Sequence, residues 1–374
     1  MSDLSEVILA RVLGWSAEDV ATERPYLQAM AMYKYDEYQQ FQPGMRFFES
    51  LALWLQQFRT AEERRTAYEF VKSRLVFISR SEMEHLVASA YPDYIRKIIL
   101  SEAAAGAGLP PHRVAQAAAH SSFRVTLRRS LFLGLSDGAH TDIFRRRNGG
   151  RISHEQVYQT YEITAGRAKA MLRELSRDLC GLSERDAPKP DKRFQMAFLL
   201  DDFSGSGRTY LREDSGTFKG KIAKLHEQAA IPGSPLNMLL DLRDARVYVV
   251  LYVCTVQARQ HLESMLPRLW GGSGPVPQVV TVHELKGNSK LCDPKDADFL
   301  SLCRTDEYYH AERLEDRSTL VGGSDVRLGF AQCCLPLVLS HNTPNNSVAL
   351  LWAYETANVH GLFPRVPRHR EVAI

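Results

Sequence analysis

Long apolar runs are missing from this chain of 374 residues. A helix that spans a bilayer needs about 20 apolar residues, whereas the longest run here, residues 247–254, has the length of a strand. The first residues are acidic and lack the basic and apolar regions of a secretion signal. These absences predict a cytoplasmic protein that has no membrane partner.

Cysteines and surplus charge are also scarce. The six cysteines form no CxxC pair, and the adjacent Cys333 and Cys334 are poorly placed to share one tetrahedral metal ion. They are expected to be reduced and mostly buried thiols. Lysine and arginine total 47 against 44 acidic residues, a net charge of +3. This balance argues against a polybasic mode of nucleic-acid binding.

The N-terminal part of the chain has a helical pattern. Apolar and aromatic residues recur at spacings of three and four in residues 4–13, 26–41, 44–58 and 62–71. A stretch of small residues and prolines, residues 103–111, then interrupts the pattern. The sequence therefore predicts a mainly helical region over residues 1–110 and an α/β domain over residues 111–374.

The second part alternates short apolar runs with helical patterns. The apolar runs are residues 130–135, 194–200, 247–254, 279–282 and 335–339. The helical patterns are residues 141–147, 155–161, 165–175, 218–228 and 258–269. Unbroken apolar strands are typical of a parallel sheet with helices on both faces. Residues 198–200 are expected in a buried central strand, while residues 74–79 are compatible with a strand or a helix end.

Residues 196–209, with the sequence MAFLLDDFSGSGRT, carry the densest chemistry. Asp201 and Asp202 follow an apolar strand, and ligands of open α/β sheets bind at the carboxyl ends of strands. The loop beyond them contains Ser204, Gly205, Ser206, Gly207, Arg208 and Thr209. Glycines allow backbone N–H groups to approach a phosphate, hydroxyls add donors, and a helix starting near Arg208 would add its positive end.

The aspartate pair has two interpretations. At a strand end both carboxylates can point into a cleft, where they would accept hydrogen bonds from sugar hydroxyls or meet a metal ion such as Mg²⁺. Alternatively, the segment is an ordinary strand and turn, with aspartates that cap backbone groups.

This segment resembles the signature of the type I phosphoribosyltransferases. In that family an acidic pair, matched by Asp201 and Asp202, holds the ribose hydroxyls of phosphoribosyl pyrophosphate. Ser206, Gly207 and Thr209 match the end of the loop that binds the 5′-phosphate, whereas Gly205 replaces a hydroxyl residue. The resemblance implies a phosphoribosyltransferase-like fold and an Mg²⁺-dependent transfer at the ribose anomeric carbon. The lysine of a Walker loop is absent.

Two other segments have open interpretations. Ser136, Asp137 and Gly138 occupy the place of the family's diphosphate loop without its usual Arg-Gly-Gly residues, and residues 145–147 are three arginines that would supply charge or form a solvated face. Residues 335–352 contain a group of neutral polar side chains that either bind a ligand or form an Asn-Pro turn. These side chains belong to His341, Asn342, Thr343, Asn345 and Asn346.

Together with residues 74–79, this C-terminal stretch is similar to bacterial phosphoribosyltransferase-like effectors of conflict systems, including retron cassettes. That similarity implies a toxic effector in anti-phage defence that acts on phosphoribosyl pyrophosphate or a nucleotide. It also implies a protein or reverse transcriptase–nucleic acid partner for the N-terminal region. The alternative is a non-catalytic sensor or assembly module with the same fold.

Overall fold

A computed structural model describes residues 3–182, 193–315, 319, 321–323, 325–353 and 359–365. The chain forms two compact units. The sheet unit is Met83–Leu285, and the terminal unit combines Met1–Glu82 with Lys286–Ile374. Residue 110, where the sequence predicts a division, lies inside the sheet unit, and the C-terminal stretch joins the N-terminal residues.

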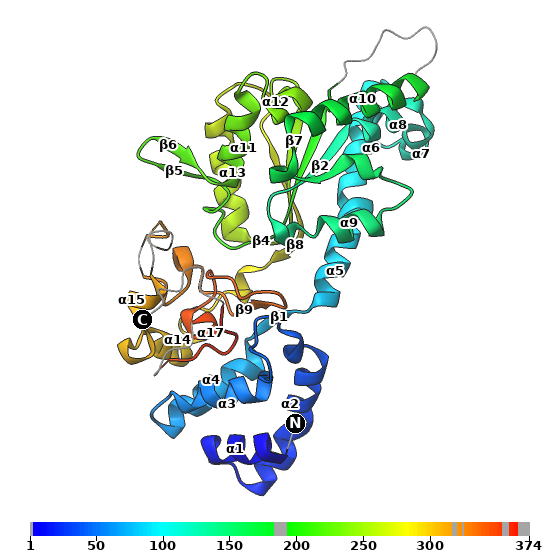
Figure 1. The fold of residues 1–374 in the computed structure, drawn as a ribbon. Coiled ribbons are helices and arrows are strands. Elements are labelled where there is room, and N and C mark those ends of the chain that lie inside the picture. Colours follow the sequence, from blue (N-terminus) through cyan, green and yellow to red (C-terminus); the bar gives the residue numbers. More distant parts are fainter. Residues whose placement is uncertain are drawn as a thin grey trace. The chain divides into compact units, whose positions relative to one another are not determined.

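The sheet unit is built on five parallel strands in the order β3-β2-β4-β7-β8. Figure 1 labels β2, β4, β7 and β8 among the helices of this unit. The strands are β2 (Ser130–Gly134), β3 (Val157–Gln159), β4 (Met196–Ser204), β7 (Arg246–Thr255) and β8 (Gln278–Leu285). This architecture confirms the predicted α/β class with a mainly parallel sheet.

The middle of the sheet is apolar on both faces. Phe132, Phe198 and Tyr248 are register partners on neighbouring strands, and their rings stack at centroid distances of 5.3 and 5.0 Å. Leu199 on the opposite face of β4 joins the large apolar core of this unit. Burial on both faces explains the unbroken apolar runs, and the predicted central strand is confirmed.

Helices flank the sheet on both faces. On one face, apolar residues of the sheet share a core with Met171, Leu225 and Leu262 from the helices. On the other face, Phe144 and Tyr91 contact the ring of Phe132. The helices of this unit are α5 (Arg80–Ser89, which begins before the boundary), α6 (Arg96–Gly106), α7 (Val114–Ala119), α8 (Ser121–Arg128), α9 (Thr141–Arg147), α10 (Ala165–Leu182), α11 (Lys221–Ala230), α12 (Pro235–Leu239) and α13 (Val256–Trp270).

Two predicted helical patterns differ in the structure. Residues 155–161 are not a helix, because Val157–Gln159 pair with β2 as the edge strand β3 between two short 3₁₀ turns. Residues 218–219 belong to an antiparallel hairpin of β5 (Arg212–Asp214) and β6 (Thr217–Lys219), and α11 begins only after it. Ser215 and Gly216 both have positive φ values, which suits the tight turn of this hairpin.

The terminal unit is mainly helical, as predicted for its N-terminal part. Its helices are α1 (Asp3–Leu13), α2 (Ala17–Tyr33), α3 (Phe47–Gln56), α4 (Ala61–Ser73), α14 (Ala297–Arg304), α15 (Ala311–Leu314) and α17 (Ala349–Trp352). Stacking of Phe70 on Phe299, with ring centroids 3.7 Å apart, links the N-terminal and C-terminal segments in one core.

The apolar run at residues 335–339 does not join the main sheet. Its strand β9 (Leu337–Leu339) pairs in parallel with β1 (Val76–Ile78) in a separate two-stranded sheet. Residues 74–79 therefore contain a strand. No helix in the described part of the chain is long and apolar enough to cross a membrane.

Candidate functional site

The loop after β2 lies against two residues of β4 at the carboxyl edge of the sheet. Because β2 and β4 are parallel neighbours, the segments that follow them leave the same edge. The hydroxyl of Ser136, after β2, donates a hydrogen bond to Asp201 Oδ1. A Cβ added at Gly138 would lie 2.6 Å from Asp202 Oδ2, so a side chain there would displace the carboxylate. The structure therefore brings residues 136–138 against the aspartate pair.

Strand β4 does not end before the aspartates but continues to Ser204. Successive side chains of a strand point to opposite faces. Asp201 accordingly turns toward the first residue of α11 and is fully buried, whereas the half-buried Asp202 lies against Gly138. The expectation that both carboxylates face one cleft is not met, because the strand pairing with β7 extends past them.

Asp201 is enclosed by donors. Its Oδ2 accepts hydrogen bonds from the Tyr210 hydroxyl at 2.7 Å and from Lys221 Nζ at 2.5 Å, and Oδ1 accepts from Ser136. Burial, with the nearby negative charge of Asp202, raises the pKa of Asp201, and Lys221 and Ser136 oppose that rise. Burial and the two aspartates raise the pKa of Tyr210 well above its usual value. Tyr210 therefore keeps its proton and remains a donor.

The glycine loop, residues 204–209, has a fixed backbone. Gly207 has a φ of 74°, and a Cβ there would lie 2.8 Å from His261 Cδ2 and 3.0 Å from the carbonyl oxygen of Ala258. The Thr255 hydroxyl donates to the carbonyl of Gly205 at 2.6 Å and accepts from the N–H of Ala258 at 3.0 Å. The loop is thereby held against the first turn of α13.

Several donors of the glycine loop lack a protein partner. The Ser204 hydroxyl is buried and has no hydrogen-bond partner among the described residues. Within the same part of the chain, no acceptor is found for the backbone N–H groups of Ser206, Gly207 and Thr209. Ser206 and Gly207 are buried residues, whereas Thr209 is exposed and its N–H can donate to solvent. Buried polar groups are nearly always hydrogen-bonded in native proteins. A ligand that carries several acceptor oxygens would supply the missing partners.

No helix starts near Arg208, contrary to expectation. Residues 208–210 form a turn, the β5–β6 hairpin follows, and α11 begins at Lys221. The first N–H groups of α11, from Lys221 and Ile222, donate to the carbonyls of Thr209 and Tyr210 at 3.2 and 2.9 Å. The positive end of α11 is therefore used to hold the turn.

A comparison with family models now decides the family. The model named PRTase-CE, a phosphoribosyltransferase-like family, matches residues 51–365. The chain belongs to the PRTase-CE family. The matched range includes both loops described above and parts of both compact units. Searches of curated proteins and of solved structures give no match.

Two residues of the edge strand region support the site of this PRTase-CE protein, and sequence reasoning missed both. In the orientation of the Gln159 side-chain amide that gives both its oxygen and its nitrogen a partner, the nitrogen donates to the carbonyls of Gly134 and Ser136 at 3.1 and 3.3 Å. The Tyr161 hydroxyl donates to Asp137 Oδ1. Lys221 and Tyr210 were also missed, since nothing in the pattern places them beside Asp201. The sequence signal for the contact of Gln159 was the glycine at position 134, at the end of an apolar strand. In the structure, a Cβ at Gly134 would collide with the Gln159 side chain.

The arginines at residues 145–147 have protein partners. Arg145 donates to the carbonyl of Val157 at 2.7 Å, and Arg146 pairs with Asp142 at 2.7 Å. Arg147 lies 3.5 Å from Glu84. These contacts favour a structural and solvated face over a direct role at the diphosphate loop.

The expected Mg²⁺ ligands differ in their suitability. No group of three or more histidine, cysteine or acidic side chains in the described ranges could hold a metal ion. Asp201 does not fit, because the Lys221 ammonium already occupies the side where a cation would bind. Asp202 does fit, since Mg²⁺ is commonly held by one or two carboxylates together with phosphate oxygens of a substrate.

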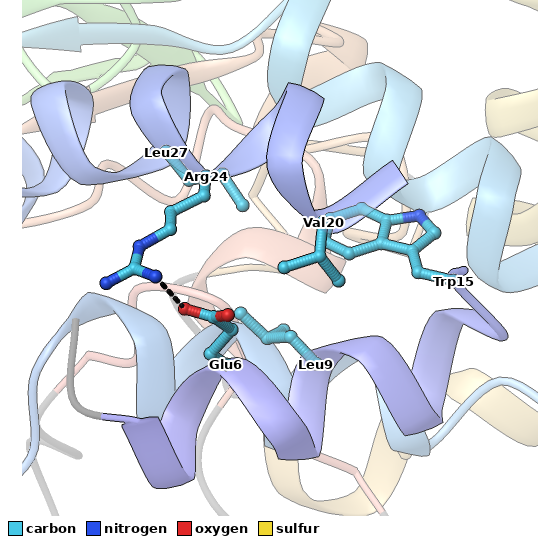
Figure 2. A pocket seen from close by; sticks show the side chains of 6 residues that line it. All are labelled: Glu6, Leu9, Trp15, Val20, Arg24 and Leu27. Carbon is cyan, nitrogen blue, oxygen red and sulfur yellow. Dashed lines mark ion pairs between the residues drawn. The ribbon is translucent and has the colours of Figure 1, made fainter. Parts of the chain in front are cut away.

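A hollow in the terminal unit contains none of the predicted site residues. It covers about 180 Å³, including open solvent, between α1 and α2 (Figure 2). Four apolar side chains line it, and Glu6 and Arg24 form an ion pair of 3.0 Å beside them. The charges there already neutralise each other, so the carboxyl edge of the sheet remains the stronger candidate.

Proposed function

We propose that this protein is a phosphoribosyltransferase-like enzyme that acts at the ribose anomeric carbon of a phosphoribosyl or nucleotide substrate. The observation that carries the proposal is the contact of residues 136–138 with Asp201 and Asp202 of β4, the strand that leads into a glycine loop where the buried Ser204 hydroxyl has no partner among the described residues. Membership of the PRTase-CE family supports the same assignment.

Each part of the edge has a proposed role. Residues 204–209 bind the 5′-phosphate through N–H and hydroxyl donors, Asp202 accepts hydrogen bonds from the ribose hydroxyls, and residues 136–138 face the leaving group. Asp201 is a positioning residue, because it connects Ser136 to Lys221 across the site. Reaction at the anomeric carbon passes through an oxocarbenium-like state. Fixing the reactants contributes up to about 7–11 kcal/mol to barrier lowering.

A magnesium ion fits this arrangement through Asp202 and substrate oxygens. When bound, the ion would neutralise negative charge that develops on a leaving diphosphate. The protein itself contributes the carboxylate of Asp202, which lies close to the backbone of Gly138.

A second candidate is a sensor that binds the sugar phosphate without turnover. It is favoured by the loop at residues 136–138, which lacks the usual Arg-Gly-Gly residues, and by the protein partners of residues 145–147. Both candidates are compatible with a role as an effector in cytoplasmic anti-phage defence. The N-terminal region would then contact a protein or a reverse transcriptase–nucleic acid partner, as the sequence resemblance implies.

The test follows turnover and binding in the same preparation. The full chain is incubated with Mg²⁺, phosphoribosyl pyrophosphate and a pool of nucleotides, and release of diphosphate or free base is measured. Asp202→Asn should abolish turnover and leave the melting temperature unchanged, because its carboxylate lies at the site edge. Asp214→Asn, in the exposed hairpin, is the matched control. Ribose 5-phosphate binding without turnover supports the sensor, whereas absence of both contradicts the proposal.

A further inference from the structure

Tyr161 presents an aromatic ring beside the site. Tyr161 is 64% exposed, while its hydroxyl donates to Asp137, which lies three residues beyond the end of β2 in the loop at residues 136–138. The other large apolar side chains exposed on the described part of the sheet unit are aliphatic; they are Val114, Ile231 and Val276. Tyr161 therefore combines an open ring face with an anchored position at the site.

The strand order places this ring at one end of the site. The order β3-β2-β4-β7 puts, along the carboxyl edge, Tyr161 after β3, Gly138 after β2, and the glycine loop after β4. That loop is fastened on the far side to Thr255 of β7. Gln159, the last residue of β3, is level with Leu200 of β4, two residues before Asp202. Neighbouring strands are about 4.8 Å apart, so β3 lies roughly 10 Å from β4 at this level.

This spacing matches the parts of a nucleotide. If the 5′-phosphate occupies residues 204–209 and the ribose lies at Asp202, the group on the anomeric carbon extends toward β2 and β3. The ring of Tyr161 lies in that direction. An aromatic face of this kind stacks on a base without hydrogen-bond readout.

The ring is held in place by the same contacts that shape the loop. Gln159, two residues earlier, donates to the carbonyl of Ser136. The hydrogen bond to Asp137 raises the pKa of Tyr161 above its usual value, which favours the protonated phenol that donates this bond. A ring that is already ordered loses little entropy when a base stacks on it.

We propose that Tyr161 is the platform on which the base of a bound nucleotide stacks. The substrate class is then a nucleoside 5′-phosphate with its base attached, and not phosphoribosyl pyrophosphate alone. This inference rests on the proposed function, because it uses the same phosphate loop and ribose position. Stacking accepts any base, so AMP and UMP should bind with affinities within about tenfold of each other.

The test separates the base from the sugar phosphate. Dissociation constants of AMP, UMP and ribose 5-phosphate are measured by calorimetry for the unmodified protein, Tyr161→Ala and Tyr161→Phe. Tyr161→Ala should weaken both nucleotides about 5- to 100-fold and leave ribose 5-phosphate unchanged. Tyr161→Phe keeps the ring and should stay within about threefold. Tyr33→Ala, which removes a tyrosine that is 75% exposed in the terminal unit, is the control and should change nothing.

Four results would contradict the inference in different ways. Unchanged nucleotide affinity in Tyr161→Ala overturns it directly. Equal weakening of AMP and ribose 5-phosphate assigns Tyr161 a role in shaping the loop instead. If the unmodified protein binds ribose 5-phosphate but neither nucleotide, the base platform is wrong while the phosphate loop stands. If it binds none of the three ligands, the proposed function and this inference both fail.

Discussion

Two segments of the chain pass from an apolar strand into a polar turn, and they differ in how their polar groups are satisfied. In the turn after β9, the Thr343 hydroxyl donates to the carbonyl of Phe363 at 2.9 Å and contacts the Tyr38 hydroxyl at 3.0 Å. Ser347 donates to the carbonyl of Leu337 at 2.6 Å. In the loop after β4, by contrast, the buried Ser204 hydroxyl has no partner in the described ranges.

The comparison shows that a count of polar residues does not identify a site. Residues 341–346 are as rich in hydrogen-bonding groups as residues 204–209, yet their described side chains mainly hold the terminal unit together. Polar groups that have protein partners stabilise the fold. A buried donor that lacks one is compatible with a ligand where it lies at the carboxyl end of a strand, as Ser204 does. Substitutions in the two segments should therefore have opposite effects on stability and on binding.

The largest effect is expected at Gly207. Gly207→Val adds a branched side chain at a positive φ, against His261 and the carbonyl of Ala258. Because the loop must move to accept it, ribose 5-phosphate binding should weaken more than about 100-fold, and the free energy of unfolding should fall by about 1–3 kcal/mol. Calorimetric titration and chemical denaturation measure the two quantities.

Gly216 provides the matched control for this substitution. It also has a positive φ, 76°, but a Cβ there would meet no atom within 4 Å. Gly216→Ala therefore adds backbone strain alone and should leave the affinity for ribose 5-phosphate unchanged. Normal affinity in Gly207→Val would show that the anion binds elsewhere.

The next largest effect is expected at Lys221, whose ammonium group pairs with the buried Asp201 of β4. Lys221→Met removes the ammonium from a buried carboxylate. Removing one partner of a buried pair costs about 3–5 kcal/mol, and the partial exposure of the lysine reduces the expected loss to about 2 kcal/mol at neutral pH. Urea denaturation from pH 4 to pH 8 measures this loss.

The sign of the pH dependence follows from the pKa of Asp201. Burial raises that pKa in the folded protein above its ordinary value of 3.8, and loss of Lys221 raises it further. The contribution of protonated Asp201 to stability is fully present below the unfolded value and is lost as pH rises through the folded value. The variant should therefore differ least from the unmodified protein near pH 4 and most near pH 8. Lys219→Met, on the exposed hairpin, should show no such trend, and a pH-independent loss in Lys221→Met would contradict the assignment.

Much of the sheet was predictable because strands that are buried on both faces consist of unbroken apolar residues. The unbroken apolar residues of β4 predicted a central strand and those of β7 predicted a strand, and the structure confirms both. The partner of β9 was not predictable, since an apolar run does not specify which strand it pairs with, and β1 lies some 260 residues earlier in the chain. Strand β3 was missed because its three residues are too short to show a period.

Some residues of the candidate site were likewise predictable from the sequence, and others were not. Residues 201–209 are contiguous, so the aspartates and the glycine loop were visible in the sequence. Lys221 lies 20 residues beyond Asp201, and Ser136 lies 65 residues before it. Contacts of this kind depend on the turn, the hairpin and the strand order, none of which a local pattern specifies. The extension of β4 through the aspartates also escaped prediction, because polar residues in a strand resemble a loop.

The two smaller effects are expected at two buried serines, Ser347 and Ser204. Ser347→Ala leaves the carbonyl of Leu337 without its side-chain donor in the core of the terminal unit. This loss should lower the free energy of unfolding by about 1–3 kcal/mol. The affinity for ribose 5-phosphate should stay the same, since the substitution touches no donor of the glycine loop. Lower affinity at full stability would show that the turn after β9 also binds the ligand.

Ser204→Ala should give the smallest effect and the opposite pattern. The Ser204 hydroxyl is buried without a protein partner, so its removal costs no intramolecular hydrogen bond and should leave the free energy of unfolding unchanged or slightly raised. If the hydroxyl donates to the bound phosphate, its loss should reduce the binding free energy of ribose 5-phosphate by about 0.5–1.5 kcal/mol. Denaturation and calorimetric titration of the same sample separate the two effects. Reduced stability with normal affinity would mean that Ser204 serves the fold, as Ser347 does, and the distinction between the two segments would then rest on the backbone donors of Ser206, Gly207 and Thr209 alone.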